Sequence, residues 1–443
     1  MSKRRNRTSK LTETNLVLNR RDFLLTGATA VGGMMLPQIA RATGSEPGPQ
    51  KAIVFVFLRG GMDGLSLLPP HKSGSSTQTA NYLVYANGRP GIRVTNSHAL
   101  PGNSQFDINA TCERLLALWG QQDLMFIPGA GSPNSTRSHF VQQDLIDSGN
   151  PLGGAASGGF LNRALGQIPD NLQSSRVPSA ALSNGLPLSL RGSESAVAIP
   201  DLNVSLTTQG ITSVLSMESR LQKMWEAVIQ AEPKWVDYLL RKNGNRARKS
   251  LSVIREAAQL PASQFSPLGG KLSDNFHHYA GMSSFYNGAK LLKADPAIRF
   301  LTIDINGWDH HINLGANDGS FFNLMGRLDR ALGAFAHDLQ QAGLWNNVRV
   351  VVMSEFGRRV TANGASGLDH GRGGVMMVLG GGLQGKRVLQ RNWNLTDLEQ
   401  GDVKVTVDYR DVLAELFVKY QNIPVEKLNQ IFPGYIPNFL GII

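Results

Sequence analysis

The sequence has little cysteine and little charge, and it has no long apolar run. Among its 443 residues there is one cysteine, Cys112, so no disulfide can form within the chain. Charged residues make up 17% of the chain and hydrophobic residues 41%, a balance that excludes wholesale disorder. Apart from a short run near the N-terminus, no stretch approaches the roughly 20 apolar residues of a membrane-spanning helix. The composition therefore excludes a multi-pass membrane protein.

The net charge of +11 is concentrated near the N-terminus. Residues 1–42 hold eight Lys or Arg and two acidic residues, which leaves 36 basic and 31 acidic residues in the rest of the chain. Nucleic-acid-binding proteins carry clustered basic stripes. The one local cluster here, within residues 241–249, is explained by a solvated helix end or turn. We therefore expect no nucleic-acid partner.

Residues 1–42 have the order of an export signal. The pair Arg20-Arg21 precedes a moderately apolar run from Phe23 to Ile39, and Ala40-Arg41-Ala42 fits a small-x-small cleavage site. Paired arginines close to Phe-Leu-Leu resemble the twin-arginine signal, which its translocase reads as an address. We predict that the twin-arginine translocase exports the protein to the periplasm or the cell exterior.

Residues 43–443 alternate between apolar runs and amphipathic segments. The apolar runs are typical of strands buried on both faces of a parallel sheet, and they lie at 51–58, 124–127, 298–305, 348–353 and 375–379. Segment 322–342 places its leucines on one helical face. This alternation predicts one α/β domain over 43–443, with a mainly parallel central sheet flanked by helices. We also expect a helical cap or insertion at about 211–260 and irregular chain over 151–210.

Polar residues cluster where the predicted strands end. In an open α/β sheet, ligands bind beyond the carboxyl ends of the strands. The residues expected at this edge are Asp63, Asp309, His311, Glu355, Asp369 and His370. Carboxylates with imidazoles suit a divalent cation such as zinc, manganese, magnesium or calcium, and a cation also relieves repulsion between the acids. A single Asp or His in a loop is more often a turn or cap residue. The recurrence of acidic residues and histidines at the ends of several predicted strands, however, predicts a metal site.

Four further residues are candidates for catalysis. Ser138 precedes a helical pattern, where Ser ordinarily caps the first turn but can also present its hydroxyl and backbone N–H groups to an anion. Thr136 is the alternative hydroxyl. Arg137 and Arg358 can either bind oxyanions with two parallel hydrogen bonds or pair with nearby acids.

The order and spacing of several motifs resemble the domain-of-unknown-function family 1501 (DUF1501) of exported bacterial proteins, nearly from end to end. Besides the twin-arginine leader, the matching stretches are Leu58–Leu65 (LRGGMDGL), Arg137–Gln143 (RSHFVQQ), Gly307–Asn313 (GWDHHIN), Ser354–Arg358 (SEFGR), Gly367–Gly371 (GLDHG), Leu379–Gly382 (LGGG), Val407–Leu413 (VDYRDVL) and Phe432–Gly434 (FPG). The family usually has Thr where His310 stands. This departure leaves open whether His310 or His311 faces the site.

That family is similar in turn to the alkaline phosphatase and sulfatase superfamily. This second resemblance implies an alkaline-phosphatase-like fold and a nucleophile at Ser138 or Thr136. It also implies metal ligands at Asp63, Asp309, His311 and His370. The superfamily often has Asp-His where this chain has Glu355-Phe356. The missing histidine argues against a complete two-metal site and leaves one metal, or none.

Two functions are expected from these observations. The first is an exported metal-dependent hydrolase of phosphate or sulfate esters, whose substrate is an anionic small molecule or a polysaccharide ester. The second is a non-catalytic exported protein that binds or assembles an exported partner on a phosphatase-like scaffold. The missing histidine motivates this alternative, because a fold does not dictate a function.

Overall fold

The computed structural model describes residues 50–154, 157–169, 175–202, 249–260, 279 and 281–443. The predicted signal over 1–42 and most of the predicted insertion at about 211–260 lie outside the described residues. At the end of that insertion, residues 249–259 are helical. No helix within the described ranges combines the length and apolar character needed to cross a membrane.

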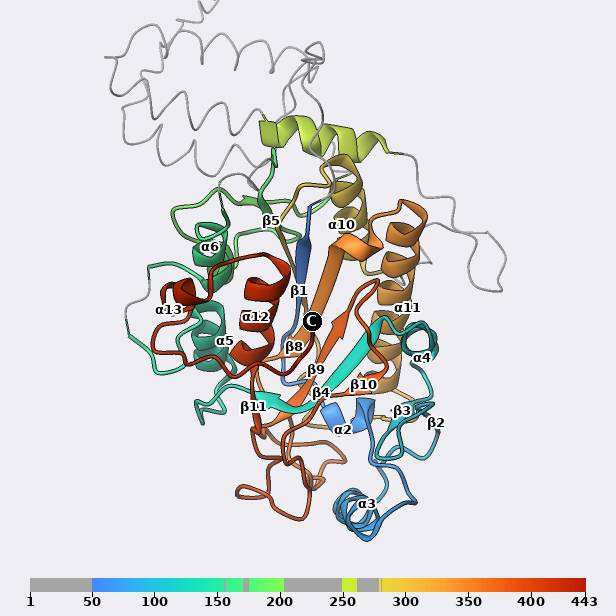
Figure 1. Ribbon diagram of the computed structural model, residues 1–443. Coiled ribbons are helices and arrows are strands. Elements are labelled where there is room, and N and C mark those ends of the chain that lie inside the picture. Colours follow the sequence, from blue (N-terminus) through green and yellow to red (C-terminus); the bar gives the residue numbers. More distant parts are fainter. Residues whose placement is uncertain (1–49, 155–156, 170–174, 203–248, 261–278, 280) are drawn as a thin grey trace, which may run out of the picture.

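A nine-stranded sheet forms the centre of the molecule, in the order β10-β4-β9-β8-β1-β7-β5-β6 with β11 paired to β4 (Figure 1). The strands are β1 (Ala52–Leu58), β4 (Leu124–Gly131), β5 (Ser179–Ala181), β6 (Val197–Ala198), β7 (Phe300–Ile305), β8 (Val348–Ser354), β9 (Gly374–Leu379), β10 (Arg387–Val388) and β11 (Val407–Asp408). Every residue of β1 is buried between β7 and β8, both of which run parallel to it. The predicted α/β fold with a mainly parallel sheet is confirmed.

β9 alone runs against the direction of the other strands in this sheet. It pairs antiparallel with β4 on one side and with β8 on the other. The amino end of β9 therefore lies at the edge where β1, β4, β7 and β8 have their carboxyl ends. Residues that precede β9 consequently meet residues that follow the other four strands.

Helices cover both faces of the sheet. Figure 1 shows α4 (Glu113–Gly120), α10 (Ser283–Ala294) and α11 (Ser320–Gln341) on one side of it. On the other side lie α5 (His139–Ser148), α6 (Phe160–Leu165), α12 (Tyr409–Glu415) and α13 (Leu428–Ile431). Successive residues of a strand point to opposite faces. Val54 and Val56 therefore join the core that contains α11, whereas Phe55 and Phe57 join the core that contains α12.

Residues 151–202 are more regular than predicted, because α6, β5 and β6 lie within them. β5 and β6 have only three and two residues, which is too short for a recognisable apolar period. The remaining described elements are α2 (Gly64–Leu67), α3 (Ser76–Gly88), β2 (Ser97–Ala99), β3 (Asp107–Asn109), η3 (Leu188–Leu190), η4 (Trp345–Asn347), η5 (Leu416–Tyr420) and η6 (Val425–Lys427). They link the strands and helices around the central sheet.

Candidate metal centre

Three polar segments meet at the edge where β9 begins and its neighbours end. His139 is the first residue of α5, which follows β4, and Asp309 and His311 follow β7. His370 precedes β9 and is brought to the same edge by the antiparallel direction of that strand. These four side chains form the candidate metal centre.

Three imidazole nitrogens and one carboxylate oxygen converge in this centre. The Nε2 atom of His370 lies 3.0 Å from that of His139 and 2.8 Å from that of His311. Asp309 Oδ1 lies 3.4 Å from Nε2 of both His139 and His370, and 3.0 Å from Nε2 of His311. Ligand atoms about 2.0–2.1 Å from a tetrahedral zinc ion are about 3.3 Å apart. The spacing of His139, His370 and Asp309 therefore fits ligands of a single ion, and His311 lies beside them.

Hydrogen bonds made by the Nδ1 atoms of His139 and His370, on the side of each ring away from the centre, direct the Nε2 atoms into the centre. His139 Nδ1 lies 2.6 Å from Glu355 Oε1, and His370 Nδ1 lies 2.7 Å from the backbone oxygen of Arg137. An ionised carboxylate and a carbonyl only accept hydrogen bonds, so both Nδ1 atoms carry a proton. In neutral rings, both Nε2 lone pairs then point at the same place. This arrangement is typical of metal-bound histidines.

A shared proton is the alternative way to compensate the two facing lone pairs. The hydrogen bond to Glu355 raises the pKa of His139, whereas burial lowers the pKa of His370. A proton on His139 Nε2 would satisfy the contact with His370. It would leave the approach of His311 to His370 unexplained. His139, Asp309 and His370 have ligand atoms close enough together to share one cation, and His311 lies beside them against His370.

Asp309 is ionised and oriented by Arg358. Burial alone would raise the pKa of Asp309, but the hydrogen bond and the charge of Arg358 lower it to about 2. The three guanidinium nitrogens of Arg358 all donate hydrogen bonds, including one of 2.6 Å to Asp309 Oδ1 and others to backbone oxygens of Gly61 and Leu368. The Arg358 side chain is only 1% exposed. Arg358 therefore positions Asp309 and joins loops, and it is not placed to hold a substrate oxyanion.

Glu355 lies behind His139, although it was predicted as a metal ligand. Its carboxylate is fully buried and accepts hydrogen bonds from the backbone N–H of Gly60 at 2.9 Å and from Gln143 Nε2 at 2.7 Å, in addition to His139. Burial would raise the pKa of Glu355, but the bonds from His139 and Gln143 hold it at about 2. Its oxygens are occupied by these donors, so Glu355 orients the imidazole of His139 and is not placed to be a ligand itself.

Asp63 is not part of the centre. Its two oxygens form a paired contact with Arg89, at 2.5 and 2.9 Å, and both side chains are almost completely buried. Arg89 also donates to the backbone oxygen of Val360 at 2.9 Å. The carboxylate charge is therefore balanced by an arginine 26 positions later, and Asp63 has no free oxygen directed at a metal.

The two predicted hydroxyl groups lie beside the centre. Ser138 is exposed and directly precedes His139, and its side chain makes no capping hydrogen bond within the described part of the chain. Thr136 Oγ1 accepts a hydrogen bond of 3.3 Å from the backbone N–H of Ser138. Arg137 pairs through its guanidinium with the buried carboxylate of Asp402. Of the alternatives for Arg137, the structure therefore shows pairing with an acid.

The remaining predicted residues belong to the surroundings of His311. Asp369 Oδ1 lies 3.6 Å from His311 Nδ1, and its side chain is 56% exposed. His310 is buried, and its ring lies close to those of Trp308 and Phe321. His311, and not His310, therefore faces the centre.

His139 was not among the predicted ligands. Its partners Asp309 and Glu355 lie more than 150 positions away in the sequence, so local pattern does not relate His139 to them. The one available signal was its place in the stretch Arg137–Gln143, which resembles the DUF1501 motif.

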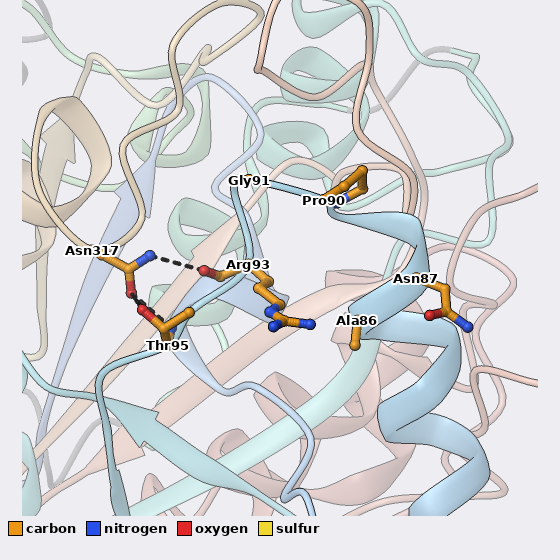
Figure 2. Close-up of a pocket in the computed structure, with 7 residues that line it drawn as sticks. All are labelled: Ala86, Asn87, Pro90, Gly91, Arg93, Thr95 and Asn317. Atoms are coloured by element: carbon orange, nitrogen blue, oxygen red, sulfur yellow. Dashed lines mark hydrogen bonds between the residues drawn. The ribbon is translucent and has the colours of Figure 1, made fainter.

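The centre is open to solvent rather than enclosed. The side chains of Asp309 and His311 are 48% and 41% exposed. A cavity of about 610 Å³ lies elsewhere, at the end of α3, where Asn317 hydrogen-bonds to the backbone of Arg93 and Thr95 (Figure 2). A second cavity, of about 550 Å³, is lined by residues of α5 together with Arg59 and Asp304.

Comparison with known proteins identifies a family. The model of the family described as "Protein of unknown function (DUF1501)" matches residues 127–419. None of the curated proteins matches the chain significantly.

Several solved structures are distantly similar. The structure of Ps i-CgsB in complex with k-i-k-neocarrahexaose is 10% identical, with 87% of this chain and 74% of that chain covered and a TM-score of 0.40. A protein in the alkaline phosphatase superfamily from Vibrio parahaemolyticus is 8% identical, with 85% and 72% covered and a TM-score of 0.29. The lipoteichoic acid synthase LtaP from Listeria monocytogenes is 10% identical, with 86% and 80% covered and a TM-score of 0.29. Likenesses this distant do not establish the chemistry of the present chain.

Proposed function

Because the chain belongs to DUF1501, a family of proteins of unknown function, we propose a function from its own site: a metal-dependent hydrolase of phosphate or sulfate esters that is exported from the cytoplasm. The observation that supports this proposal is the convergence of the Nε2 atoms of His139 and His370 on Asp309 Oδ1. Their geometry and their tautomers suit a bound cation.

The donor set favours zinc, or a similar transition metal, over magnesium or calcium. Imidazole nitrogen suits zinc, whereas magnesium and calcium take oxygen ligands almost exclusively. His139, His370 and Asp309 would hold the ion, and His311, which is more exposed than the other two histidines, would be a fourth ligand or would leave that position to substrate. When bound, zinc polarises an ester oxygen and lowers the pKa of a coordinated water or hydroxyl group.

The residues around the centre have separate roles in this proposal. Glu355 and the backbone oxygen of Arg137 keep the Nε2 lone pairs of His139 and His370 directed at the ion. Ser138 presents a hydroxyl group at the N-terminus of α5, where the helix dipole favours an anion such as phosphate or sulfate. Ser138 is therefore the first candidate nucleophile, and Thr136 is the second.

The test combines metal analysis with assays of ester hydrolysis. We expect purified wild-type protein to bind zinc and to hydrolyse aryl phosphate or aryl sulfate esters. His139→Ala should lose both properties, and His98→Ala, which removes a histidine of β2, should keep both. Metal-free wild-type protein that stays inactive after zinc is added would contradict the proposal.

One observation favours the second candidate function, a non-catalytic binding protein. Phe140 and Ile312 are 84% and 64% exposed, and each directly follows a histidine of the centre. Exposed apolar side chains beside an open site suit contact with another protein. If wild-type protein binds zinc without hydrolysing any ester, and Phe140→Ser loses a co-purifying exported protein but keeps its zinc, the binding function is supported instead.

A further inference from the structure

A chain of hydrogen bonds runs behind the metal centre from Arg59 to His139. Arg59 Nη1 donates to Gln143 Oε1 at 3.1 Å, and Gln143 Nε2 donates to Glu355 Oε1 at 2.7 Å. His139 Nδ1 lies 2.6 Å from the same Glu355 oxygen. Each contact is within hydrogen-bonding distance, so the four side chains form one continuous chain.

The chemistry of its two charged members sets the direction of this chain. A guanidinium group can only donate hydrogen bonds, and an ionised carboxylate can only accept them. The amide of Gln143 must therefore turn its oxygen to Arg59 and its NH₂ group to Glu355. A flipped amide would place its oxygen against the Glu355 carboxylate and its NH₂ group against the guanidinium. Arg59 thus determines which group Gln143 offers to Glu355.

The side chains of this hydrogen-bonded series are held in place by separate parts of the fold. Gln143 lies four residues after His139 on α5, so both side chains lie on one face of that helix. Arg59 directly follows β1, and its Nη2 atom lies 3.2 Å from Asp147 Oδ2 and 3.1 Å from Asp304 Oδ1. Its guanidinium group also lies over the ring of Phe57, 4.4 Å from the ring centroid. Arg59 is therefore held by several contacts of its own while it donates to the amide oxygen of Gln143.

We infer that Gln143 and Arg59 are positioning residues that fix the tautomer of His139 and thereby the metal affinity of the centre. Neither residue contacts the predicted ion. Gln143 and His139 both donate a hydrogen bond to Oε1 of Glu355. The bond from Gln143 keeps the Glu355 carboxylate directed at Nδ1 of the His139 ring. The inference deepens the proposed function. Its test by zinc affinity rests on that function, whereas its test by the tautomer of His139 does not.

The test is a double-mutant cycle on zinc affinity, measured by competition with a chromophoric chelator. Gln143→Leu removes both hydrogen bonds at similar volume, and we expect it to weaken zinc binding about 10-fold or more, the effect usual for partners of metal ligands. Arg59→Lys keeps the charge but loses the planar fork, and we expect a smaller loss. Because Arg59 acts through Gln143, adding Arg59→Lys to Gln143→Leu should cause no further loss.

A second measurement does not depend on metal. In ¹⁵N NMR spectra of metal-free protein, recorded at a pH at which His139 is neutral, its two ring nitrogens should show a single tautomer with the proton on Nδ1, and Gln143→Leu should produce a mixture of tautomers. Asp144→Asn, an exposed change on the same helix, is the matched control and should leave zinc affinity and tautomer unchanged.

The two proposals fail in different ways. Wild-type affinity and an unchanged tautomer in Gln143→Leu, or additive losses in the double variant, would overturn the positioning role alone. Wild-type protein that binds no zinc would overturn the proposed function, and the tautomer measurement would then decide on the positioning role by itself.

Discussion

Glu355 and the backbone oxygen of Arg137 accept hydrogen bonds of 2.6 and 2.7 Å from the two histidines whose Nε2 atoms face each other. At the scale of single residues, these acceptors direct the Nε2 lone pairs of two titratable rings into the candidate centre, where the proposed function places a cation. The ionised state of Glu355 is essential to this effect, because a neutral carboxyl group could itself donate a proton to the ring.

Glu355→Gln tests that requirement without changing the size of the side chain. An amide places an NH₂ group among donors that already include Gly60 N–H, Gln143 and His139. We expect zinc affinity to fall about 10- to 100-fold, as measured by chelator competition. Unchanged affinity would show that the tautomer of His139 does not depend on the charge of Glu355.

Asp63→Asn separates a structural carboxylate from a metal ligand. The variant leaves the buried Arg89 without its charged partner, and breaking such a pair costs about 3–5 kcal/mol. We expect urea denaturation to show this loss of stability, while the protein that remains folded binds zinc normally. Normal stability with lost zinc would instead make Asp63 a ligand.

At the scale of elements, the turn after β1 brings the loops of the centre together. Gly60 has a φ of +122°, and a Cβ atom added there would lie 2.7 Å from the backbone nitrogen of Asp309. Its N–H also donates to Glu355. Only glycine therefore allows the end of β1 to lie against the loop that carries Asp309.

Gly60→Ala should therefore damage stability and zinc binding together. We expect a loss of about 2 kcal/mol or more in the free energy of unfolding, together with weaker zinc affinity, because the Asp309 loop must move. Gly91→Ala is the matched control, since Gly91 has a φ of +79° and no atom within 4 Å of an added Cβ. It should cost about 1 kcal/mol and leave zinc affinity intact.

Helix α5 also contains a carboxyl group whose titration affects stability. Burial raises the pKa of Asp147 to about 6 from a usual value of 3.8, despite the opposing charge of Arg59. Because the pKa is higher in the folded protein, the folded state binds the extra proton between these values. The resulting stability is present below about pH 4 and is lost as the pH rises through 6.

Asp147→Asn should remove this part of the pH dependence. Relative to wild type, we expect the variant to gain about 2–3 kcal/mol of stability between pH 4 and pH 7, measured by denaturant unfolding at each pH. The exposed Asp144→Asn should follow the wild-type curve. Parallel curves for Asp147→Asn and wild type would rule out the raised pKa.

At the scale of the whole molecule, the centre joins segments from four parts of the chain. It is formed by the start of α5, the loop after β7 and the segment before β9, and it is supported by the loop after β8. A ligand that binds only when these segments are assembled stabilises the folded state by mass action. Metal binding should therefore be visible in global unfolding.

We expect zinc to raise the thermal unfolding temperature of the wild-type protein and a chelator to lower it. At a free zinc concentration 100 times the Kd, the stabilisation is about 2.7 kcal/mol. His139→Ala should show no such response, and calorimetry at several zinc concentrations measures it. An equal response in both proteins would place the zinc outside the proposed centre.

The tertiary structure decided how the candidate residues are used. Among the predicted ligands, it brought Asp309, His311 and His370 together, but it paired Asp63 with Arg89 and put Glu355 behind His139. Apart from its place in the motif Arg137–Gln143, nothing in the sequence distinguishes His139 from an ordinary histidine at a helix start. Partners of this kind depend on contacts between distant segments.

The sequence by itself determined the family, the apolar runs and the edge at which polar residues gather, because composition, motif spacing and hydrophobic periodicity are local properties of the chain. The export signal over 1–42 stays a prediction. Only the tertiary structure decided that β9 runs antiparallel and that His139, Asp309 and His370 meet, with His311 beside them. Strand direction and charge pairing depend on which distant segments pack together, and no local pattern records that choice.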